Sequence, residues 1–266
     1  GGPFANIAHG CNSIISTKLG LKLADYVITE AGFGSDLGAE KFLDIKCRIG
    51  NLKPDCIVIV ATIKALKYNA GISKEDILLP NVDALSLGIC NLKAHIDNMK
   101  LYTNNIVVTL NKYSTDTDEE IEFVKNFVDG ENVSFSVNDA YSKGGIGAQS
   151  LAREVVKVCA CDNDFRLLYD NDISIFEKIE TVCPKIYHAN SVKYSDLALS
   201  KINDFVKLGV ENYPVCIAKT QYSLSDNPKL LGYPKDFEVT VKDVNIYTGA
   251  GFIVVYLGDI ILQYPS

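Results

Sequence analysis

The stretch CIVIVAT (residues 56–62) decides the fold class, because six of its seven residues are apolar and most are β-branched. Such a run is too uniformly apolar for a strand with one wet face, and it predicts a parallel sheet covered on both sides. Short apolar runs recur at residues 26–29, 106–110, 133–137, 214–219 and 252–257, and polar or helical stretches separate them. This alternation predicts an α/β protein with mainly parallel strands.

Helical patterns fill most of the intervals between these strands. They are expected at residues 36–47, 82–99, 118–128, 175–183 and 195–208, and from a glycine-containing turn at 143–147 to Cys159. Thr117 is a predicted N-cap, with acidic residues favourably placed in the first turn after it. Residues 237–246 alternate apolar and polar side chains, as a half-exposed strand does.

Length and changes in sequence pattern predict the domain organisation. A chain of 266 residues suggests about two domains. The sequence becomes polar and irregular at residues 67–79, and its pattern changes again near residue 173, so these two places are further candidate boundaries. We therefore expect three parts, at residues 1–70, 71–172 and 173–266, the last of them α+β with a β-rich end. The opening residues, which lack a methionine, indicate a piece of a longer chain.

Composition excludes several classes of function. The net charge of −7, without a lysine or arginine run, disfavours nucleic-acid binding. Eight cysteines are scattered, and only Cys159 and Cys161 lie close in sequence, far from all three histidines. This spacing favours reduced thiols over a metal site and indicates a reducing compartment. No apolar run approaches the ~18 residues that a membrane helix needs.

Three loops follow or precede predicted strands where α/β sheets place their ligands. The first is GGPFANIAHG (residues 1–10), in which Phe4 offers a stacking face, Asn6 an amide and His9 a titratable ring. A plain structured loop with a satisfied histidine explains these residue types better, when they are taken alone.

The second loop is TEAGFGSD (residues 29–36). A strand followed by Gly32 and Gly34 and then by a helix lets backbone N–H groups approach an anion, although such loops also serve as tight turns. Glu30 and Asp36 have the chemistry to hold magnesium or position a substrate amine.

The third loop is NKYSTDT (residues 111–117). It surrounds the aromatic ring of Tyr113, which would suit a flat heteroaromatic ligand. The alternative is a loop that only caps the following helix. The glycine-rich segment at residues 143–147 lacks the closing Lys-Ser/Thr of a phosphate-binding loop, and no nucleophile triad is evident.

Several longer segments resemble formate–tetrahydrofolate ligases (formyltetrahydrofolate synthetases), in that family's order. They are GGPFANIAHGCNS (residues 1–13), YVITEAGFGSDLGAEKF (26–42), VATIKALKYNAG (60–71), LNKYSTDTDEEI (110–121), KIYHANSVKYS (185–195), CIAKTQYSLSDNPKLLG (216–232) and GAGFIVVYLGDI (249–260). The resemblance is to the C-terminal half of the family. The GxxxxGKT phosphate loop of its N-terminal half has no counterpart in these 266 residues. The implied fold is the remnant of a P-loop-type parallel-sheet nucleotide domain followed by two smaller α/β domains.

The resemblance implies the reaction and its participants. The family formylates tetrahydrofolate with formate and ATP, through formyl phosphate, to give 10-formyltetrahydrofolate. ATP with magnesium, tetrahydrofolate and a monovalent cation are therefore the implied ligands. The resemblance also implies a cytoplasmic protein that forms a homo-oligomer and has no nucleic-acid or membrane partner. A piece of this length alone is expected to be inactive.

The resemblance also implies site residues. Thr29 and Glu30 are the catalytic candidates. The candidates for binding folate and formyl phosphate are Phe4, Asn6, Gly32, Gly34, Asn111, Tyr113, Thr115 and Asp116, with Tyr113 stacking on the pterin. No residue is assigned to a metal.

This sequence departs from the family pattern at Lys64, Asn69 and Ala70, where the family prefers arginine, histidine and glycine. It also lacks tryptophan, and its last residues replace the usual methionine, glycine and proline run. Lysine loses the bidentate geometry of arginine, and alanine resists positive φ. A diverged, non-catalytic folate-binding or assembly module therefore stays open as an alternative, as does another ATP-dependent ligase or amidotransferase partner.

Overall fold

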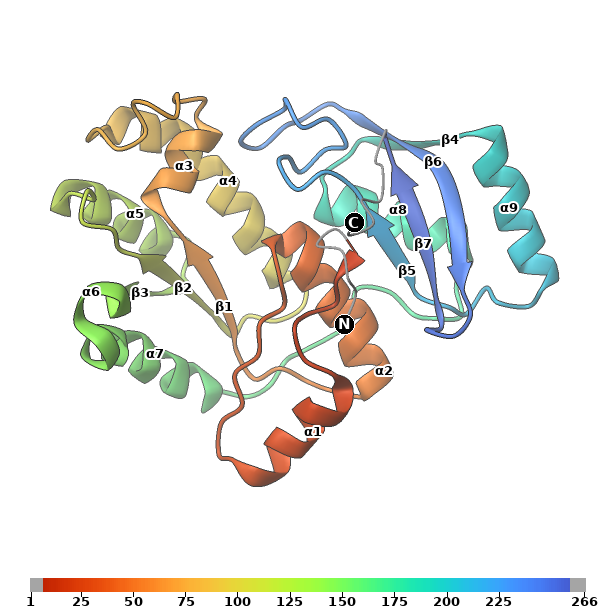
Figure 1. The fold of residues 1–266 in the computed structure, drawn as a ribbon, viewed down its shortest axis with the longest axis horizontal. Helices are drawn as coiled ribbons and strands as arrows, with labels where there is room; N and C mark the ends of the chain where they lie inside the picture. Colours follow the sequence, from red (N-terminus) through yellow and green to blue (C-terminus); the bar gives the residue numbers. More distant parts are fainter. Residues whose placement is uncertain (1–6, 259–266) are drawn as a thin grey trace, which may run out of the picture. The chain divides into compact units, whose positions relative to one another are not determined.

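The structure, a computed structural model, describes residues 7–258. The chain forms two compact units (Figure 1). Unit 1 contains residues 1–52, 167–230 and 234–266, and unit 2 contains residues 53–166 and 231–233. The division into three domains at residues 70 and 172 stays a prediction.

Unit 2 is built on a parallel sheet of three strands. These are β1 (Ile57–Ala61), β2 (Ile106–Asn111) and β3 (Ser134–Asn138), in the order β1-β2-β3. Val58 lies opposite Val107, and Leu110 lies opposite Val137, so all three strands end at the same edge. The predicted α/β class is confirmed.

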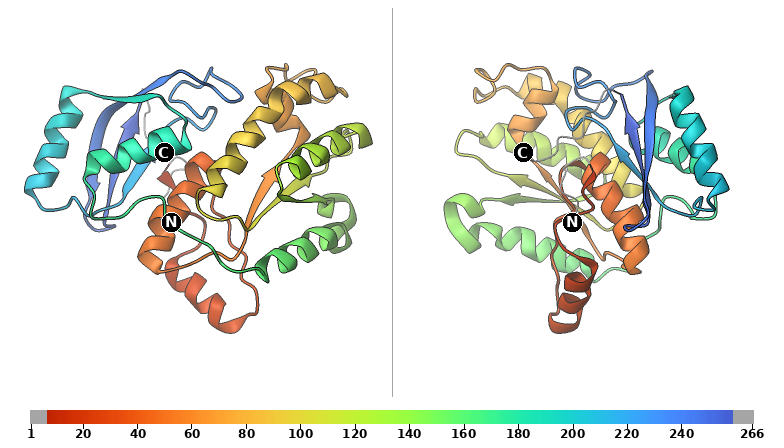
Figure 2. Two further views of the ribbon diagram at one scale, coloured as in Figure 1. Left: turned by 180° about the vertical axis from the view of Figure 1, so that it is seen from behind. Right: turned by 45° about the vertical axis from the view of Figure 1, so that its right-hand side comes forward.

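Helices connect these strands by crossovers: α3 (Ile63–Asn69) and α4 (Val82–Lys100) lie between β1 and β2, and α5 (Asp118–Gly130) lies between β2 and β3. The helix α6 (Ala140–Lys143), the 3₁₀ turn η4 (Gly144–Ala148) and the helix α7 (Gln149–Cys159) follow β3. Helices α4 and α5 lie side by side (Figure 2), as expected when both crossovers have the usual right-handed sense. Helix α3 packs closely on α4 because Gly88 has no side chain: a Cβ there would lie 1.9 Å from the Leu66 carbonyl oxygen.

The expectation that residues 56–62 are buried on both faces is wrong. β1 is an edge strand in the described sheet, and its side chains alternate in exposure. Val60 is 59% exposed, while Ala61 is buried. The apolar composition of the run therefore indicates a parallel strand correctly, but it overstates how much of this strand is covered.

Unit 1 carries a mixed sheet in the order β4-β6-β7-β5 (Figure 1). Its strands are β4 (Ser191–Tyr194), β5 (Val215–Ala218), β6 (Glu238–Tyr247) and β7 (Phe252–Leu257). β4 pairs in parallel with β6, β6 is antiparallel to β7, and β7 is parallel to β5. The helices of this unit are α1 (Ile14–Leu23), α2 (Arg48–Gly50), α8 (Ile175–Ile186) and α9 (Asp196–Lys207).

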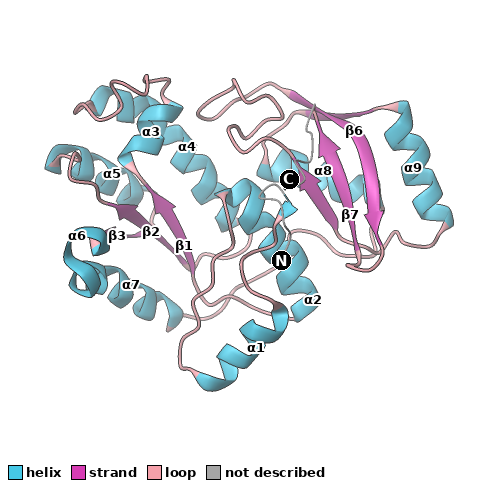
Figure 3. Cartoon of the chain, viewed as in Figure 1, coloured by secondary structure: helices cyan, strands magenta, loops and turns pink. Residues whose placement is uncertain are grey.

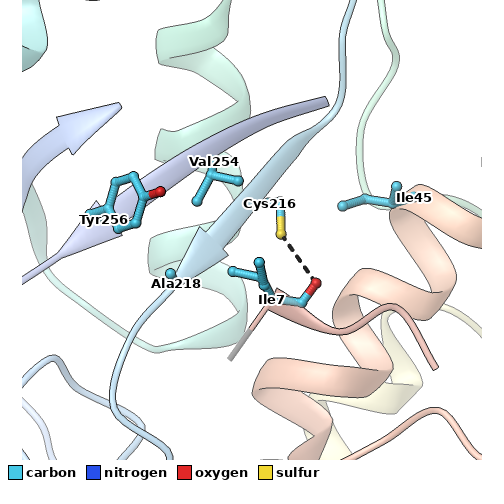
Figure 4. Close-up of a cluster of buried hydrophobic side chains, with 6 residues drawn as sticks. All are labelled: Ile7, Ile45, Cys216, Ala218, Val254 and Tyr256. Atoms are coloured by element: carbon cyan, nitrogen blue, oxygen red, sulfur yellow. Dashed lines mark hydrogen bonds between the residues drawn. The ribbon is translucent and has the colours of Figure 1, made fainter. Parts of the chain in front are cut away.

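A helix expected at residues 36–47 is present, but much of it has π-helical hydrogen bonding. The π segments are η2 (Gly34–Ala39) and η3 (Phe42–Cys47), and α2 continues directly from η3. Such wide turns are rare and often occur at functional sites. Near them, Ile7, Ile45, Cys216, Ala218, Val254 and Tyr256 form an apolar cluster (Figure 4).

The strand predicted at residues 26–29 is not formed in the described structure. The backbone leaves α1 in extended conformation at Ala24, but residues 26–29 lie in a loop (Figure 3). Ile28 is 90% exposed. Within residues 7–258 no neighbouring strand pairs with this segment, and an extended apolar segment becomes a strand only when it has one. Sequence reasoning also did not anticipate α1, α3 and β4.

Candidate functional site

The loops at the carboxyl ends of β1, β2 and β3 form one cluster in unit 2. The Asn138 side chain donates a hydrogen bond from Nδ2 to Asn111 Oδ1 at 2.8 Å, and Lys112 N–H donates to the Asn138 carbonyl oxygen at 3.0 Å. These contacts join the ends of β2 and β3. Asn111, one of the predicted folate-binding residues, therefore takes part in holding the loop in place.

Tyr113 presents its ring to solvent at this edge. Its side chain is 44% exposed, and the Lys64 ammonium of α3 lies 3.8 Å from the ring centroid. That distance is within the range of a cation–π contact. α3 begins immediately after β1, because Thr62 caps it by accepting a hydrogen bond from Ala65 N–H. The first turn of α3 is thereby brought to the loop that follows β2.

Asp116 fixes the backbone beneath this ring. Tyr113 N–H donates to Asp116 Oδ2 at 2.8 Å, and Asp116 N–H donates back to the Tyr113 carbonyl oxygen at 3.1 Å. Asp116 is buried, and desolvation raises the pKa of its carboxyl group, although the Tyr113 N–H bond opposes the shift. Thr115, by contrast, is exposed at the tip of the loop.

A buried ion pair anchors the helix that follows the loop. Lys67 Nζ lies 2.5 Å from Glu120 Oε1, and it also donates to the Leu79 carbonyl oxygen at 2.7 Å. Glu120 accepts the Thr117 N–H in the capping box that begins α5, which confirms the predicted N-cap. Burial opposes ionisation of Glu120, but its hydrogen bonds, led by that from Lys67, hold the pKa below its usual value. The loop carrying Tyr113 is therefore rigid at both ends.

The second predicted loop, residues 29–34, lies in unit 1. Thr29 Oγ1 accepts a hydrogen bond from Asn12 Nδ2 at 3.0 Å, and the Glu30 carbonyl oxygen accepts one from Cys11 N–H at 3.1 Å. Glu30 itself is exposed. Gly32 and Gly34 have φ of +97° and +74°, so both positions need glycine for backbone reasons.

Asp36, which follows this loop, has a buried partner. Its Oδ2 lies 2.6 Å from Lys219 Nζ, and the Lys219 side chain is fully buried. Lys219 also donates to the carbonyl oxygens of Thr220 and Ser223. Burial lowers the pKa of the Lys219 ammonium, against the opposing effect of Asp36. Asp36 is thus engaged in an internal ion pair, which leaves Glu30 as the exposed carboxylate of this loop.

Glu40 and Lys41 extend this buried network along the same helix. Both side chains are fully buried, and Lys41 Nζ lies 3.6 Å from Glu40 Oε2. Desolvation raises the pKa of Glu40 to about 8, although Lys41 opposes the shift. Sequence reasoning missed this network, although one signal was present. Lys219 follows an apolar strand inside one of the segments that resemble the ligase family.

The first predicted loop is only partly described. Phe4 and Asn6 lie outside the described residues. His9 packs edge-on against Phe252, with ring centroids 4.8 Å apart, and burial lowers its pKa to about 4. His9 is therefore neutral near pH 7, but among the described residues its Nδ1 is buried without a hydrogen-bond partner, so the alternative of a satisfied histidine is not confirmed.

The predicted residues thus gather into two loops, one in each unit. Asn111, Tyr113, Thr115 and Asp116 share the loop of unit 2, and Thr29, Glu30, Gly32 and Gly34 share the loop of unit 1. Within residues 7–258, no three His, Cys, Asp or Glu side chains come together as metal ligands. In that same part of the chain, none of the helices is both long and apolar enough to cross a bilayer.

Parallel strands with loops at their carboxyl ends place unit 2 in the class of α/β proteins, which commonly bind ligands at that edge of the sheet. Comparison with protein families gives the assignment. The family model for formate–tetrahydrofolate ligase matches residues 1–265, so this chain belongs to the formate–tetrahydrofolate ligase family. Family membership assigns it to ATP-dependent ligation of formate and tetrahydrofolate in one-carbon metabolism.

Proposed function

We propose that the loop of residues 111–116 forms part of the tetrahydrofolate site of an ATP-dependent formate–tetrahydrofolate ligase. The observation that carries the proposal is the exposed ring of Tyr113 at the carboxyl end of β2. The Tyr113 backbone N–H donates a hydrogen bond to the Asp116 carboxylate, which fixes the loop that carries the ring. Stacking of a pterin on this ring would contribute about 0.5–1.5 kcal/mol beyond the area it buries. Asn111 and Thr115 offer an amide and a hydroxyl on the same loop.

The proposed chemistry proceeds through formyl phosphate. A formate oxygen attacks the γ-phosphorus of ATP, and the bond to the β,γ-bridging oxygen breaks to release ADP. The N10 nitrogen of tetrahydrofolate then attacks the formyl carbon, phosphate leaves with the bonding electron pair, and the N10 proton passes to a base. Positioning and neutralisation of charge supply most of the catalysis in such phosphoryl transfers. Magnesium enters with ATP, and a monovalent cation is proposed to assist.

The loop of residues 29–34 is proposed to act on the reacting groups. Glu30 is the exposed carboxylate that would accept the proton from N10, with Thr29 as its neighbour. Backbone N–H groups at Gly32 and Gly34 would donate hydrogen bonds to phosphate oxygens, since positive φ at both residues lets the main chain approach an anion. In a full-length enzyme that carries this segment, replacement of Glu30 by glutamine should lower kcat at least tenfold and leave the affinity for tetrahydrofolate unchanged. A matched loss of affinity would make Glu30 a binding residue instead.

Lys64 is proposed to orient the Tyr113 ring, so variants at this position test the folate site. Lys64→Arg keeps a cation over the ring and should bind tetrahydrofolate as the unchanged chain does. Lys64→Ala should weaken binding about threefold, the effect of one exposed cation–π contact. Isothermal titration calorimetry measures both. Equal affinity in all three proteins would show that Lys64 does not position the ring.

Activity of this polypeptide alone discriminates catalysis from binding. We propose that it binds tetrahydrofolate but does not turn over, because no GxxxxGKT segment is present in its sequence. Formate-dependent release of ADP by the purified chain should stay at background, and clear turnover would refute this part of the proposal. The alternative, a non-catalytic folate-binding or assembly module, would show no formylation even when every other segment found in active family members is supplied.

Self-association is also proposed. Ile15 and Leu23 of α1 are 81% and 76% exposed, and they lie on one side of the helix with Leu19. Large exposed apolar groups of this kind favour association. Sedimentation velocity should therefore show oligomers, and a monodisperse monomer would contradict the proposed homo-oligomer. A cytoplasmic location stays a prediction.

A further inference from the structure

The outer edge of β3 is an open side of the sheet in unit 2. Within residues 7–258, β3 pairs with β2 alone, and no strand lies beyond it (Figure 1). Edge strands are commonly protected by a charged residue, a proline or a covering segment. The sequence of β3, SFSVN (residues 134–138), contains neither a charged residue nor a proline. This edge is therefore available to a further strand.

The hydrogen bonds of β3 indicate which main-chain groups face this open side. Lys112 N–H donates to the Asn138 carbonyl oxygen, so Asn138 directs its main-chain groups toward β2. Since this direction alternates along a strand, Phe135 and Val137 direct theirs away from β2. In agreement, Ser150 of α7 donates from Oγ to the Val137 carbonyl oxygen at 3.2 Å. The main-chain N–H groups of Phe135 and Val137 are therefore placed to bond an added strand.

A groove of about 430 Å³ lies at this edge. Residues 135–137 of β3 line it, together with Lys125 of α5 and Arg153 of α7. Ser136 Oγ lies 3.0 Å from Ser150 Oγ, so the Ser136 side chain faces α7. Because side chains alternate along a strand, those of Phe135 and Val137 face away from α7. The groove thus offers an apolar face on one side of β3 and a polar face with a guanidinium group on the other.

The charges at the groove favour an acidic partner. Lys125 Nζ lies 3.7 Å from Glu122 Oε1, and the two side chains are 47% and 58% exposed. Glu154 also lines the groove, but its Oε2 lies 3.5 Å from Lys157 Nζ. Exposed pairs of this kind are weak, so their members remain able to interact with other charges. In a chain of net charge −7, a site lined by a lysine and an arginine is a local exception that attracts anionic side chains.

We propose that the β3 edge binds an extended segment of a partner protein in which apolar and acidic residues alternate. The segment adds a fourth strand to the sheet of unit 2 and accepts hydrogen bonds from the main-chain N–H groups of Phe135 and Val137. Its apolar side chains pack beside Phe135 and Val137, and its acidic side chains lie on the opposite face, toward Arg153. A second copy of this chain fits less well. Pairing of β3 with β3 about a twofold axis would place Arg153 next to the same residue of the other copy, and like charges repel.

The probe is the fluorescein-labelled peptide Val-Glu-Val-Glu-Val-Glu with an amidated C-terminus, and fluorescence anisotropy measures its binding to the purified chain at pH 7.5. Arg153→Glu replaces an attraction by a repulsion and should weaken binding roughly tenfold. Lys74→Glu makes the same change of net charge at an exposed position of unit 2 outside the groove, and it should leave binding unchanged. The block peptide Val-Val-Val-Glu-Glu-Glu has the same composition without the alternation, so it should bind roughly tenfold more weakly. Circular dichroism establishes that each variant is folded.

Hydrogen exchange followed by NMR tests whether the bound peptide forms a strand. The Val-Glu peptide should slow exchange of the Phe135 and Val137 N–H groups at least tenfold, and it should change Ser136 little, because that N–H already faces β2. Equal binding of the alternating and block peptides, an unchanged affinity of Arg153→Glu, or no added protection at Phe135 and Val137 would each overturn the proposal. Protection of these two N–H groups in concentrated protein without peptide would assign the edge to a second copy and would overturn it as well.

Discussion

The two units use charged residues in opposite ways. In unit 1, Asp36, Glu40, Lys41 and Lys219 are buried among themselves and apolar neighbours, out of reach of a ligand. In unit 2, Lys64 lies at the surface over the exposed ring of Tyr113. Breaking a buried pair such as Asp36–Lys219 leaves an uncompensated charge in the core, whereas an exposed aromatic beside a cation has capacity left for a ligand. We therefore expect the network of unit 1 to stabilise the fold, and we propose that Tyr113 and Lys64 of unit 2 recognise the ligand.

The strongest test of the structural network is Lys219→Ala. Removal of the ammonium leaves the Asp36 carboxylate buried without its cation, which costs about 3–5 kcal/mol of unfolding free energy. Urea unfolding followed by circular dichroism measures it. As a control, Lys207→Ala removes an exposed ion pair with Asp204 and should cost less than about 1 kcal/mol. If Lys219→Ala kept its stability and lost only ligand binding, the assignment of this network to the fold would fail.

Glu40→Gln gives a smaller effect that depends on pH. Burial raises the pKa of Glu40 from 4.5 to about 8, so the folded chain holds this proton more tightly than the unfolded chain does. The associated stability is fully present below about pH 4.5, falls as pH rises, and is lost above about pH 8. Glutamine cannot ionise, so the variant should match the unchanged chain near pH 5 and exceed its stability by about 2–4 kcal/mol at pH 8.5.

Thermal unfolding of both proteins between pH 5 and 9 checks this prediction. Glu122→Gln, at an exposed position on α5, is the control and should not change the pH profile. Parallel profiles for Glu40→Gln and the unchanged chain would mean that Glu40 is ionised in the fold, and that its surroundings are more polar than the burial implies.

Thr117→Ala tests how firmly the recognition loop is held. The change removes the hydroxyl of the capping box at the start of α5 and should cost about 1–1.5 kcal/mol. Hydrogen exchange should become faster in residues 111–120 and stay unchanged in unit 1. An equal increase in the hydrogen-exchange rate of residues 111–120 and of unit 1 would contradict this prediction.

The sequence predicted the parallel sheet of unit 2 well, because the apolar runs at residues 56–62 and 106–110 carry the signal of parallel strands in their own composition. It failed at residues 26–29, where composition is equally strand-like but pairing depends on a neighbour that no local pattern specifies. The candidate loops were found because glycine, asparagine and an aromatic follow predicted strands. The Asp36–Lys219 pair was not predicted from the sequence, since its members are 183 positions apart in the chain.

The central claim, that Tyr113 stacks on tetrahydrofolate, is tested most directly by the affinity of Tyr113 variants for tetrahydrofolate in isothermal titration calorimetry. Tyr113→Phe keeps the ring and should bind as the unchanged chain does. Tyr113→Ala removes the ring and should weaken binding roughly fivefold, which corresponds to about 1 kcal/mol of stacking. Equal affinities for all three proteins would contradict the claim.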